Sequence, residues 1–390
     1  MNDKQITMIS VMPDVHGGIG HHVGYHQSVG NAARACGWRH VALVSTSHGL
    51  ARLPESWRAV LDTGLLTTGL PQVLARGKAF ALLGDMRRFT DTLVQAVQEE
   101  LRLGAAGECI VFLDDFNGPQ LLAIRQAMRR LPKERLHFWF LYRYDPAARG
   151  IAGKLYQRAV ASLIRLFPNG RFRMLTDSVP LATELKSTFG MPAHVMPIPH
   201  TSAQASRTLA RDPDEIICWW PGAPRPDKGL DVMQRLAQAP APVPAGRRIR
   251  LALSEAANIA SGVGVTVQAL PRHLSSGDYD AWLHTADVLL MPYDRQRYRL
   301  ATSGIFAECV AAGKIPLVTD GTWMAFELDR HDLRELVCDW SDPAGTLATI
   351  RRAAEDPELR QKLSRMRESF LEFHSEGAYA RELRGLASNP

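Results

Sequence analysis

Residues 298–308, YRLATSGIFAE, combine residue types that could hold a phosphorylated ligand. The pattern predicts a loop that gives way to a helix at this point. Because the first backbone N–H groups of a helix have no partner inside the helix, they are available to an anion such as a diphosphate. Glu308 comes one turn later, where its carboxylate could accept hydrogen bonds from a ribose. The candidate anion-binding residues are Thr302, Ser303, Gly304 and Ile305.

A second segment, residues 219–233 (WWPGAPRPDKGLDVM), has an apolar strand, a turn with Gly222, and then a helix. Arg225 and Lys228 lie at the mouth of this turn. A guanidinium can bind phosphate oxygens bidentately and an ammonium supplies a point charge, so the pair could hold a pyrophosphate and stabilise it as it departs. The alternative is a solvated turn with two exposed basic residues.

A third segment, the N-terminal loop and helix MPDVHGGIGHHVGYH, follows a strand and is rich in glycine and histidine. Its glycines, which let a backbone approach a ligand closely, are Gly17, Gly18 and Gly20. His21 or His22 could hydrogen-bond a bound sugar or phosphate, although a surface or capping imidazole is an equally good explanation. His22 and His26 share a helix face, but no carboxylate or cysteine completes a set of ligands, so we predict no metal site.

Two further strands end in polar residues. Asp114 and Asp115 follow VFL, and Arg143 follows HFWFLY. Ligands bind at the carboxyl ends of strands in open α/β sheets, so Asp115 could orient an acceptor hydroxyl or act as a base, and Arg143 could line the same edge. The alternatives are a cap on the helix that begins near Gly118 and an arginine that only reaches solvent.

Positive charge is concentrated in one stretch of the first half. Residues 1–200 carry 23 Lys and Arg against 15 Asp and Glu, whereas residues 201–390 carry 23 against 25. Residues 125–173 alone have 12 basic and two acidic side chains. The helix predicted at 151–167 carries Lys154 and Arg158 beside an apolar stripe, expected at Ile151, Leu155, Ala159, Leu163 and Phe167.

Such a helix could lie on an anionic membrane surface, where each basic residue adds about 1 kcal/mol. Ordinary packing on a sheet is the alternative. Nucleic acid is not expected as a partner, because no recognised nucleic-acid-binding fold or aromatic stacking pattern accompanies the charge.

In order and spacing, PGAPRPDKGLDVM, DYDAWLHTADVLLMPY and YRLATSGIFAECVAAGKIPLVT resemble the nucleotide-binding half of GT-B glycosyltransferases, especially those similar to family 4. The resemblance covers about residues 215–330. It implies a nucleoside-diphosphate sugar as co-substrate, a saccharide or lipid-linked acceptor, and retention of the anomeric configuration, with no metal or other cofactor. It also implies hexosyl transfer in polysaccharide or glycolipid synthesis. The implied roles are Arg225 and Lys228 on the diphosphate, with Glu308 on the ribose.

Two positions depart from the family pattern. The first of its two glutamates would fall at Leu300, which cannot accept hydrogen bonds from a sugar. Ala223 stands where many relatives have arginine, so Arg225 is a shifted substitute. The lack of a carboxylate at Leu300 makes a nucleotide-sugar-binding protein without catalysis one alternative. A nucleotide-sugar epimerase is another, because two such domains and a diphosphate site would serve it equally, although Leu300 argues against it.

The elements that must position these residues alternate between apolar strands and amphipathic helices. The chain of 390 residues is too long for one ordinary core. We predict an α/β protein with two doubly wound, Rossmann-like domains facing a cleft. The expected parts are an acceptor-binding domain at 1–200, a hinge at 201–213, a nucleotide-sugar-binding domain at 214–370 and a terminal helix at 371–390 that could cross back to the first domain.

The location of the protein is also predicted from its sequence. No apolar run is long enough to span a bilayer, the N-terminus lacks the features of a secretion signal, and the five cysteines are scattered. We expect a cytoplasmic protein with a peripheral contact on the inner face of the membrane.

Overall fold

The computed structural model describes residues 5–15, 22–67, 77–104, 107–114, 116–143, 145, 150–167, 170–199, 207–240 and 246–388. The chain forms two compact units. The first comprises Met1–His200 together with Ser375–Pro390, and the second comprises Thr201–His374. The C-terminal segment therefore belongs to the same unit as the N-terminus.

The first unit is built on a sheet of seven parallel strands in the order β3-β2-β1-β4-β5-β6-β7. Its central strands are nearly continuous apolar runs, as expected where helices cover both faces of a parallel sheet. The strands are β1 (Ile6–Met12), β2 (Arg39–Ser45), β3 (Trp57–Leu61), β4 (Glu108–Asp114), β5 (Leu136–Tyr142), β6 (Phe172–Thr176) and β7 (Ala193–Val195).

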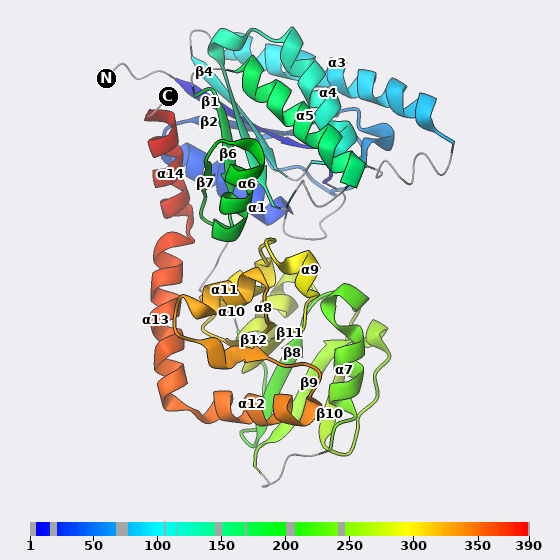
Figure 1. Ribbon diagram of the computed structural model, residues 1–390, viewed down its shortest axis with the longest axis vertical. Coiled ribbons are helices and arrows are strands. Elements are labelled where there is room, and N and C mark those ends of the chain that lie inside the picture. Colours follow the sequence, from blue (N-terminus) through cyan, green and yellow to red (C-terminus); the bar gives the residue numbers. More distant parts are fainter. Residues whose placement is uncertain are drawn as a thin grey trace. The chain divides into compact units, whose positions relative to one another are not determined.

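Helices cover both faces of this sheet (Figure 1). They are α1 (His22–Ala35), α3 (Ala79–Leu103), α4 (Gly118–Arg130), α5 (Gly150–Leu166), α6 (Val179–Phe189) and α14 (Glu376–Ser388). Short 3₁₀ turns occur at Gly64–Thr67 and Lys133–Arg135. α3, α4 and α5 are consecutive neighbours, and α1 packs beside α14.

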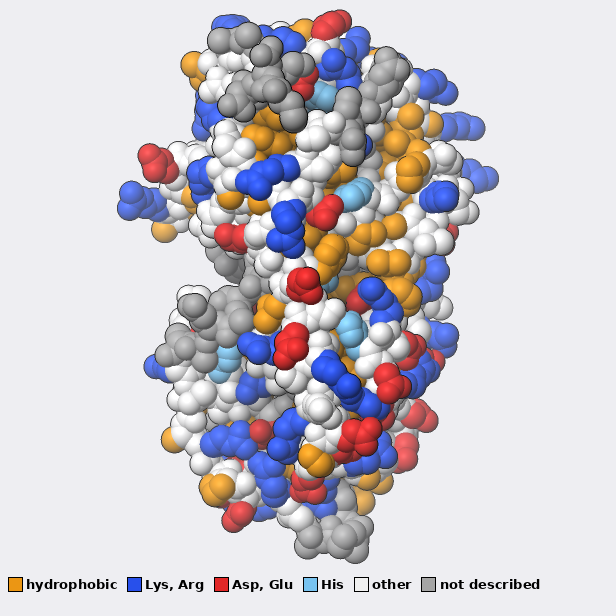
Figure 2. Space-filling model, turned by 90° about the vertical axis from the view of Figure 1, so that its left-hand side faces the viewer, with side chains coloured by type: hydrophobic (Ala, Val, Ile, Leu, Met, Phe, Trp, Pro, Cys, Tyr) orange, Lys and Arg blue, Asp and Glu red, His pale blue; other side chains and the backbone are white. Residues whose placement is uncertain are grey.

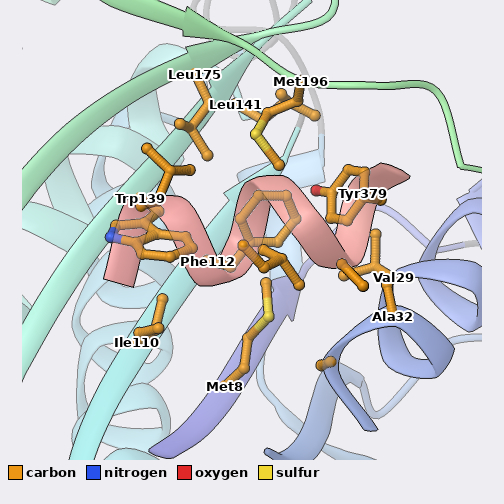
Figure 3. Close-up of a cluster of buried hydrophobic side chains, with 14 of the residues drawn as sticks. Met8, Val29, Ala32, Ile110, Phe112, Trp139, Leu141, Leu175, Met196 and Tyr379 are labelled. Carbon is orange, nitrogen blue, oxygen red and sulfur yellow. The ribbon is translucent and has the colours of Figure 1, made fainter. Parts of the chain in front are cut away.

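The last helix, α14, completes the core of the first unit. Its Tyr379, Ala380 and Leu383 are buried in a cluster with side chains of α1 and of the central strands. Figure 3 shows Tyr379 among residues from α1, β1, β4, β5 and β6, including Val29, Met8, Phe112, Trp139 and Leu175. A segment more than 170 residues away in sequence thus supplies part of this hydrophobic core.

The second unit has six parallel strands in the order β10-β9-β8-β11-β12-β13. These are β8 (Glu215–Trp220), β9 (Arg248–Ser254), β10 (Val265–Leu270), β11 (Val288–Met291), β12 (Ile315–Thr319) and β13 (Val337–Cys338). The helices are α7 (Leu230–Ala237), α8 (Ser276–Thr285), α9 (Arg295–Tyr298), α10 (Gly304–Ala311), α11 (Trp323–Asp329), α12 (Pro343–Glu355) and α13 (Pro357–Phe373). Three 3₁₀ turns, η4 (Pro226–Lys228), η5 (Glu255–Ala257) and η6 (Arg334–Leu336), complete the unit.

Two details differ from the sequence-based prediction. The short strands β3, β7 and β13 were not expected. The apolar stripe predicted for the helix at 151–167 is buried at Ala159, Leu163 and Phe167 but was wrong at Leu155, which is 53% exposed, because Tyr156 and Val160 are buried in its place.

The described part of the chain contains no helix that is long and apolar enough to cross a membrane. All five cysteines are described and none forms a disulfide; Cys36 is half-buried and the others are buried. Burial raises the pKa of the Cys109 and Cys338 thiols to about 12. These cysteines are therefore packed, protonated thiols.

Candidate functional site

The turn after β8 lies against the first turn of α10. Gly222 in this turn has φ of +92°, which favours glycine. A Cβ atom at Gly222 would lie 3.1 Å from the Lys228 Nζ and 3.8 Å from the Ile305 Cδ1. The structure thus brings together three of the predicted site residues, from the turn after β8 and the first turn of α10, which are about 80 residues apart in the sequence.

Aromatic side chains hold Lys228 in place. The Nζ atom lies 5.3 Å from the centre of the Tyr293 ring, which is buried, and the Trp220 indole donates a hydrogen bond of 3.1 Å to the Lys228 carbonyl. A cation over a ring face is attracted by the ring quadrupole. The ammonium group is therefore fixed at the end of β8 rather than extended into solvent.

The position of Lys228 also changes its acidity. Burial, together with the nearby charges of Arg225 and Arg297, lowers the pKa of Lys228 to about 8, although Asp227 opposes the change. Burial of a lysine amine away from water disfavours its charged, ammonium form. A bound anion would favour the charged form again, so this lysine is suited to recognising a phosphate.

Arg225 is the more exposed of the two predicted cations, with 45% of its side chain accessible. It donates a hydrogen bond of 3.0 Å to Asp227, and the same Asp227 oxygen lies 3.2 Å from the Arg297 Nε. The Asp227 carbonyl accepts a hydrogen bond of 3.0 Å from the backbone N–H of Asp294. Asp227 therefore ties the Arg225 turn to α9.

Ser303 is the N-cap of α10. Its hydroxyl accepts a hydrogen bond of 3.3 Å from the Phe306 N–H, and Gly304 is the first helical residue. The amides at the start of α10 are positioned as an anion-binding helix end requires. Thr302 is half-buried beside them. Leu300, at the family's first glutamate position, is only 7% exposed, so its side chain packs inward.

Glu308, predicted to hold a ribose, has a partner that the sequence analysis did not identify. The Tyr279 hydroxyl on α8 donates a hydrogen bond of 2.5 Å to its carboxylate. The Tyr279 ring packs edge-on against Trp219, with centroids 5.0 Å apart. Burial and the Glu308 charge both raise the pKa of Tyr279, so the phenol stays protonated and keeps the carboxylate in place.

Tyr279, Tyr293, Asp227 and Arg297 were not predicted as site residues. The first two lie in the segment DYDAWLHTADVLLMPY, which carries the family resemblance. That resemblance could have drawn attention to the tyrosines, but no sequence spacing indicates that Tyr279 contacts Glu308 or that Asp227 contacts both arginines.

In the first unit, Arg143 belongs to a buried polar network at the carboxyl ends of the strands. It donates to Asp114 through Nε at 2.6 Å and Nη2 at 3.0 Å, and to Asp177 through Nη1 at 2.9 Å. Its guanidinium also lies 4.3 Å from the centre of the Tyr25 ring. The His26 Nε2 is 3.3 Å from Asp114.

This network determines the charge of Asp114. Burial alone would raise the pKa of Asp114, but the Arg143 guanidinium and His26 hold it well below its usual range. An ionised carboxylate that accepts two hydrogen bonds from one arginine, as a bidentate pair, is a poor proton acceptor. The cap on α4, which was the alternative role for Asp114 and Asp115, is supplied by Asn117 instead.

The other residues predicted from the sequence lie partly outside the described residues and partly on the surface of α5. Gly17, Gly18, Gly20, His21 and Asp115 lie outside the described residues, and α1 begins at His22. Lys154 and Arg158 are exposed on α5. Within the described ranges, no group of three or more His, Cys, Asp or Glu side chains is arranged to hold a metal ion.

Comparison with known proteins identifies the fold of this chain. No protein-family model matches the sequence, and no curated protein matches it. Solved structures do match. The Anabaena protein HepE in complex with UDP-glucose is 11% identical, with 98% of this chain and 100% of that chain covered and a TM-score of 0.63. OtsA is 13% identical, with 98% and 99% covered and a TM-score of 0.62. HepE and OtsA have the GT-B fold.

The protein has the GT-B fold. A third similar structure, the N-terminal domain of Candida albicans trehalose-6-phosphate phosphatase, is 12% identical, with 98% of this chain and 97% of that chain covered and a TM-score of 0.61. The predicted fold class is thus confirmed. Because the identities are low, the match to family 4 stays a prediction.

Proposed function

We propose that this GT-B protein is a glycosyltransferase that moves a sugar from a nucleoside-diphosphate sugar to an acceptor hydroxyl. One observation carries the proposal. The Lys228 ammonium lies beside Gly222 and Ile305 at the start of α10, and Glu308, positioned by Tyr279, lies one turn further along the helix. A cation, a helix N-terminus and a carboxylate follow one another as the diphosphate and ribose of such a donor do.

The proposed chemistry is electrostatic. As the anomeric C–O bond breaks, positive charge develops on the sugar and negative charge on the departing diphosphate. Lys228, Arg225 and the first amides of α10 lower the barrier to the extent that they bind this charge more tightly in the transition state than in the ground state. We propose that these protein groups suffice without a bound metal, so activity should persist in excess chelator.

For the transferred sugar and the acceptor, we propose chemical classes rather than single compounds. HepE has been solved with UDP-glucose, which makes UDP-glucose the first donor to test. We propose a hexose as the transferred group, a saccharide or lipid-linked molecule as the acceptor, and retention of configuration, in polysaccharide or glycolipid synthesis. Leu300 leaves the sugar end of the donor without the family's first carboxylate.

The deciding experiment measures donor binding and turnover together. UDP-glucose and a panel of other nucleotide sugars are titrated into the protein and then incubated with and without candidate acceptors. Lys228→Ala should weaken binding and slow transfer. The matched control is Arg235→Ala on α7, which removes an exposed cation that pairs with Asp231 at 2.8 Å.

Each outcome bears on one of the candidate functions. Nucleotide release that depends on an acceptor supports the transferase. Conversion of the donor without an acceptor indicates an epimerase, and binding without any conversion indicates a non-catalytic binding protein. If no nucleotide sugar binds, or if Lys228→Ala and Arg235→Ala behave alike, the proposed site is wrong.

A further inference from the structure

A groove of about 650 Å³ runs between α4 and α5 of the first unit. These two helices lie next to each other on one face of the sheet (Figure 1). Two arginines from each helix line the groove, and an exposed leucine from each helix lies beside them. The residues are Arg125, Arg129 and Leu122 on α4, and Arg158, Arg165 and Leu155 on α5.

The four arginines have no acidic partners among the described residues. Neither an ion pair nor a hydrogen bond joins any of them to a described carboxylate, whereas Arg130 on the same helix pairs with Asp91 at 2.5 Å. Arg125 donates a hydrogen bond of 3.0 Å to the Ser162 hydroxyl at the centre of the groove. Uncompensated guanidiniums that share one groove attract an anion with several acceptor oxygens.

The pKa of Arg125 is consistent with several arginines lying close together in the groove. Partial burial, followed by the charges of Arg129 and Arg165, lowers the pKa of Arg125. Because like charges repel, bringing these side chains together costs folding free energy that a bound anion would recover. By contrast, the face in Figure 2 has Lys and Arg side chains interspersed with Asp and Glu.

Exposed leucines distinguish this groove from a site for a small free anion. Leu122 is 38% exposed and Leu155 is 53% exposed. A phosphate ion needs only the arginines, whereas a membrane surface offers both headgroup phosphates and an apolar layer beneath them. The groove has no aromatic lining residue on which a nucleic-acid base could stack.

We propose that the α4–α5 groove docks on an anionic membrane, with a lipid headgroup phosphate between the four arginines and with Leu122 and Leu155 in contact with the interface. This surface overlaps only in part with the one expected from the sequence. Leu163 and Phe167 of the expected stripe are buried, so the contact is made by Leu155 and Arg158 on the side of α5 that faces α4. The proposal concerns binding to lipid and is independent of the transferase activity.

The test is sedimentation of the full-length protein with two kinds of vesicle, one of phosphatidylcholine alone and one that also contains phosphatidylglycerol. The wild type should bind the anionic vesicles, and added salt should weaken this binding. Arg129→Glu combined with Arg165→Glu should lower the affinity by at least about tenfold, since each basic residue near the surface contributes measurably.

The matched control changes the same net charge elsewhere on the first unit. Arg52→Glu combined with Lys186→Glu alters two exposed basic residues outside the groove, and it should bind anionic vesicles nearly as well as the wild type. Leu155→Asn should weaken binding without altering its dependence on salt. Thermal unfolding of every variant establishes that the comparison is made between folded proteins.

Three results would overturn the proposal. Equal binding of the wild type to neutral and anionic vesicles would remove the headgroup interaction. Equal binding by the groove variant and the control variant would place the contact elsewhere. Stabilisation of the wild type by inorganic phosphate, without binding to either vesicle, would identify a site for a free anion.

Discussion

At the scale of single residues, the lowered pKa of Lys228 predicts that the affinity for an anionic ligand depends on pH. Its pKa is lowered to about 8, so the charged form that binds a phosphate is lost as the pH rises through this value. UDP binding should therefore take up protons and weaken above about pH 8, by up to tenfold per pH unit. Calorimetric titration with UDP from about pH 7 to about pH 9.5 measures this.

Lys228→Arg is the control for this pH dependence. A guanidinium stays charged across the whole range, so the affinity of the variant for UDP should be nearly constant with pH. If the wild type and Lys228→Arg show the same pH profile, the titrating group is another residue.

The hydrogen bond from Tyr279 to Glu308 gives a second prediction at this scale. Tyr279→Phe removes the donor but keeps the ring against Trp219, so the fold should be retained. If Glu308 holds the ribose, UDP affinity should fall by about 0.5–1.5 kcal/mol, whereas pyrophosphate, which has no ribose, should bind as before. Equal losses for UDP and pyrophosphate would contradict the assigned role.

At the scale of elements, the strands that could be predicted from the sequence are the fully buried ones. β1 matches the apolar run ITMISVM at 6–12 residue for residue. β4, β5 and β8 begin and end within two residues of the runs CIVFLDD at 109–115, HFWFLYR at 137–143 and EIICWWPG at 215–222. Strands covered by helices on both faces must be apolar throughout. β7 and β13 have only three and two residues, and β3 is half-buried at its centre, so none of them has a long apolar run.

The sequence could predict those parts of the candidate site that depend only on residues close to one another in the chain. Ser303 and Gly304 could be assigned to a helix start because capping depends on neighbouring residues. The contacts of Tyr279 with Glu308, and of Arg143 with Asp114, join residues 29 apart in the sequence. Such pairs depend on which elements are adjacent in the fold, so neither contact could be seen from spacing alone.

The turn after β8 gives a prediction about an element. Gly222→Ala places a Cβ 3.1 Å from the Lys228 Nζ at a positive φ, so both the turn and the ammonium must shift. We expect a loss of about 1 kcal/mol of stability and a larger loss of UDP affinity. Gly190→Ala is the control, because Gly190 also has a positive φ, of +70°, but its Cβ would meet no atom within 4 Å.

Gly190→Ala should therefore lower the melting temperature while leaving UDP binding unchanged. Thermal melts and UDP titrations of both variants separate the backbone cost from the displacement of Lys228. Unchanged UDP affinity in Gly222→Ala would show that the ammonium position does not matter for binding.

At the scale of the whole molecule, the two units differ in how continuous they are in sequence. The second unit is one uninterrupted segment, whereas the first needs α14 from the far end of the chain. Leu383 on α14 is fully buried in the core cluster of the first unit. Leu383→Ala should cost about 2–5 kcal/mol, because it leaves a cavity between α14 and the sheet.

This loss should be confined to the first unit. Hydrogen exchange should rise in peptides of β1, β4, β5 and α1, while peptides of β8, β11 and α10 keep their protection and UDP still binds. Leu103→Ala is the control, because Leu103 is 64% exposed at the end of α3, and it should change neither unit. Equal loss of protection in both units would mean that they unfold together, because in that case the core completed by α14 would also support the second unit.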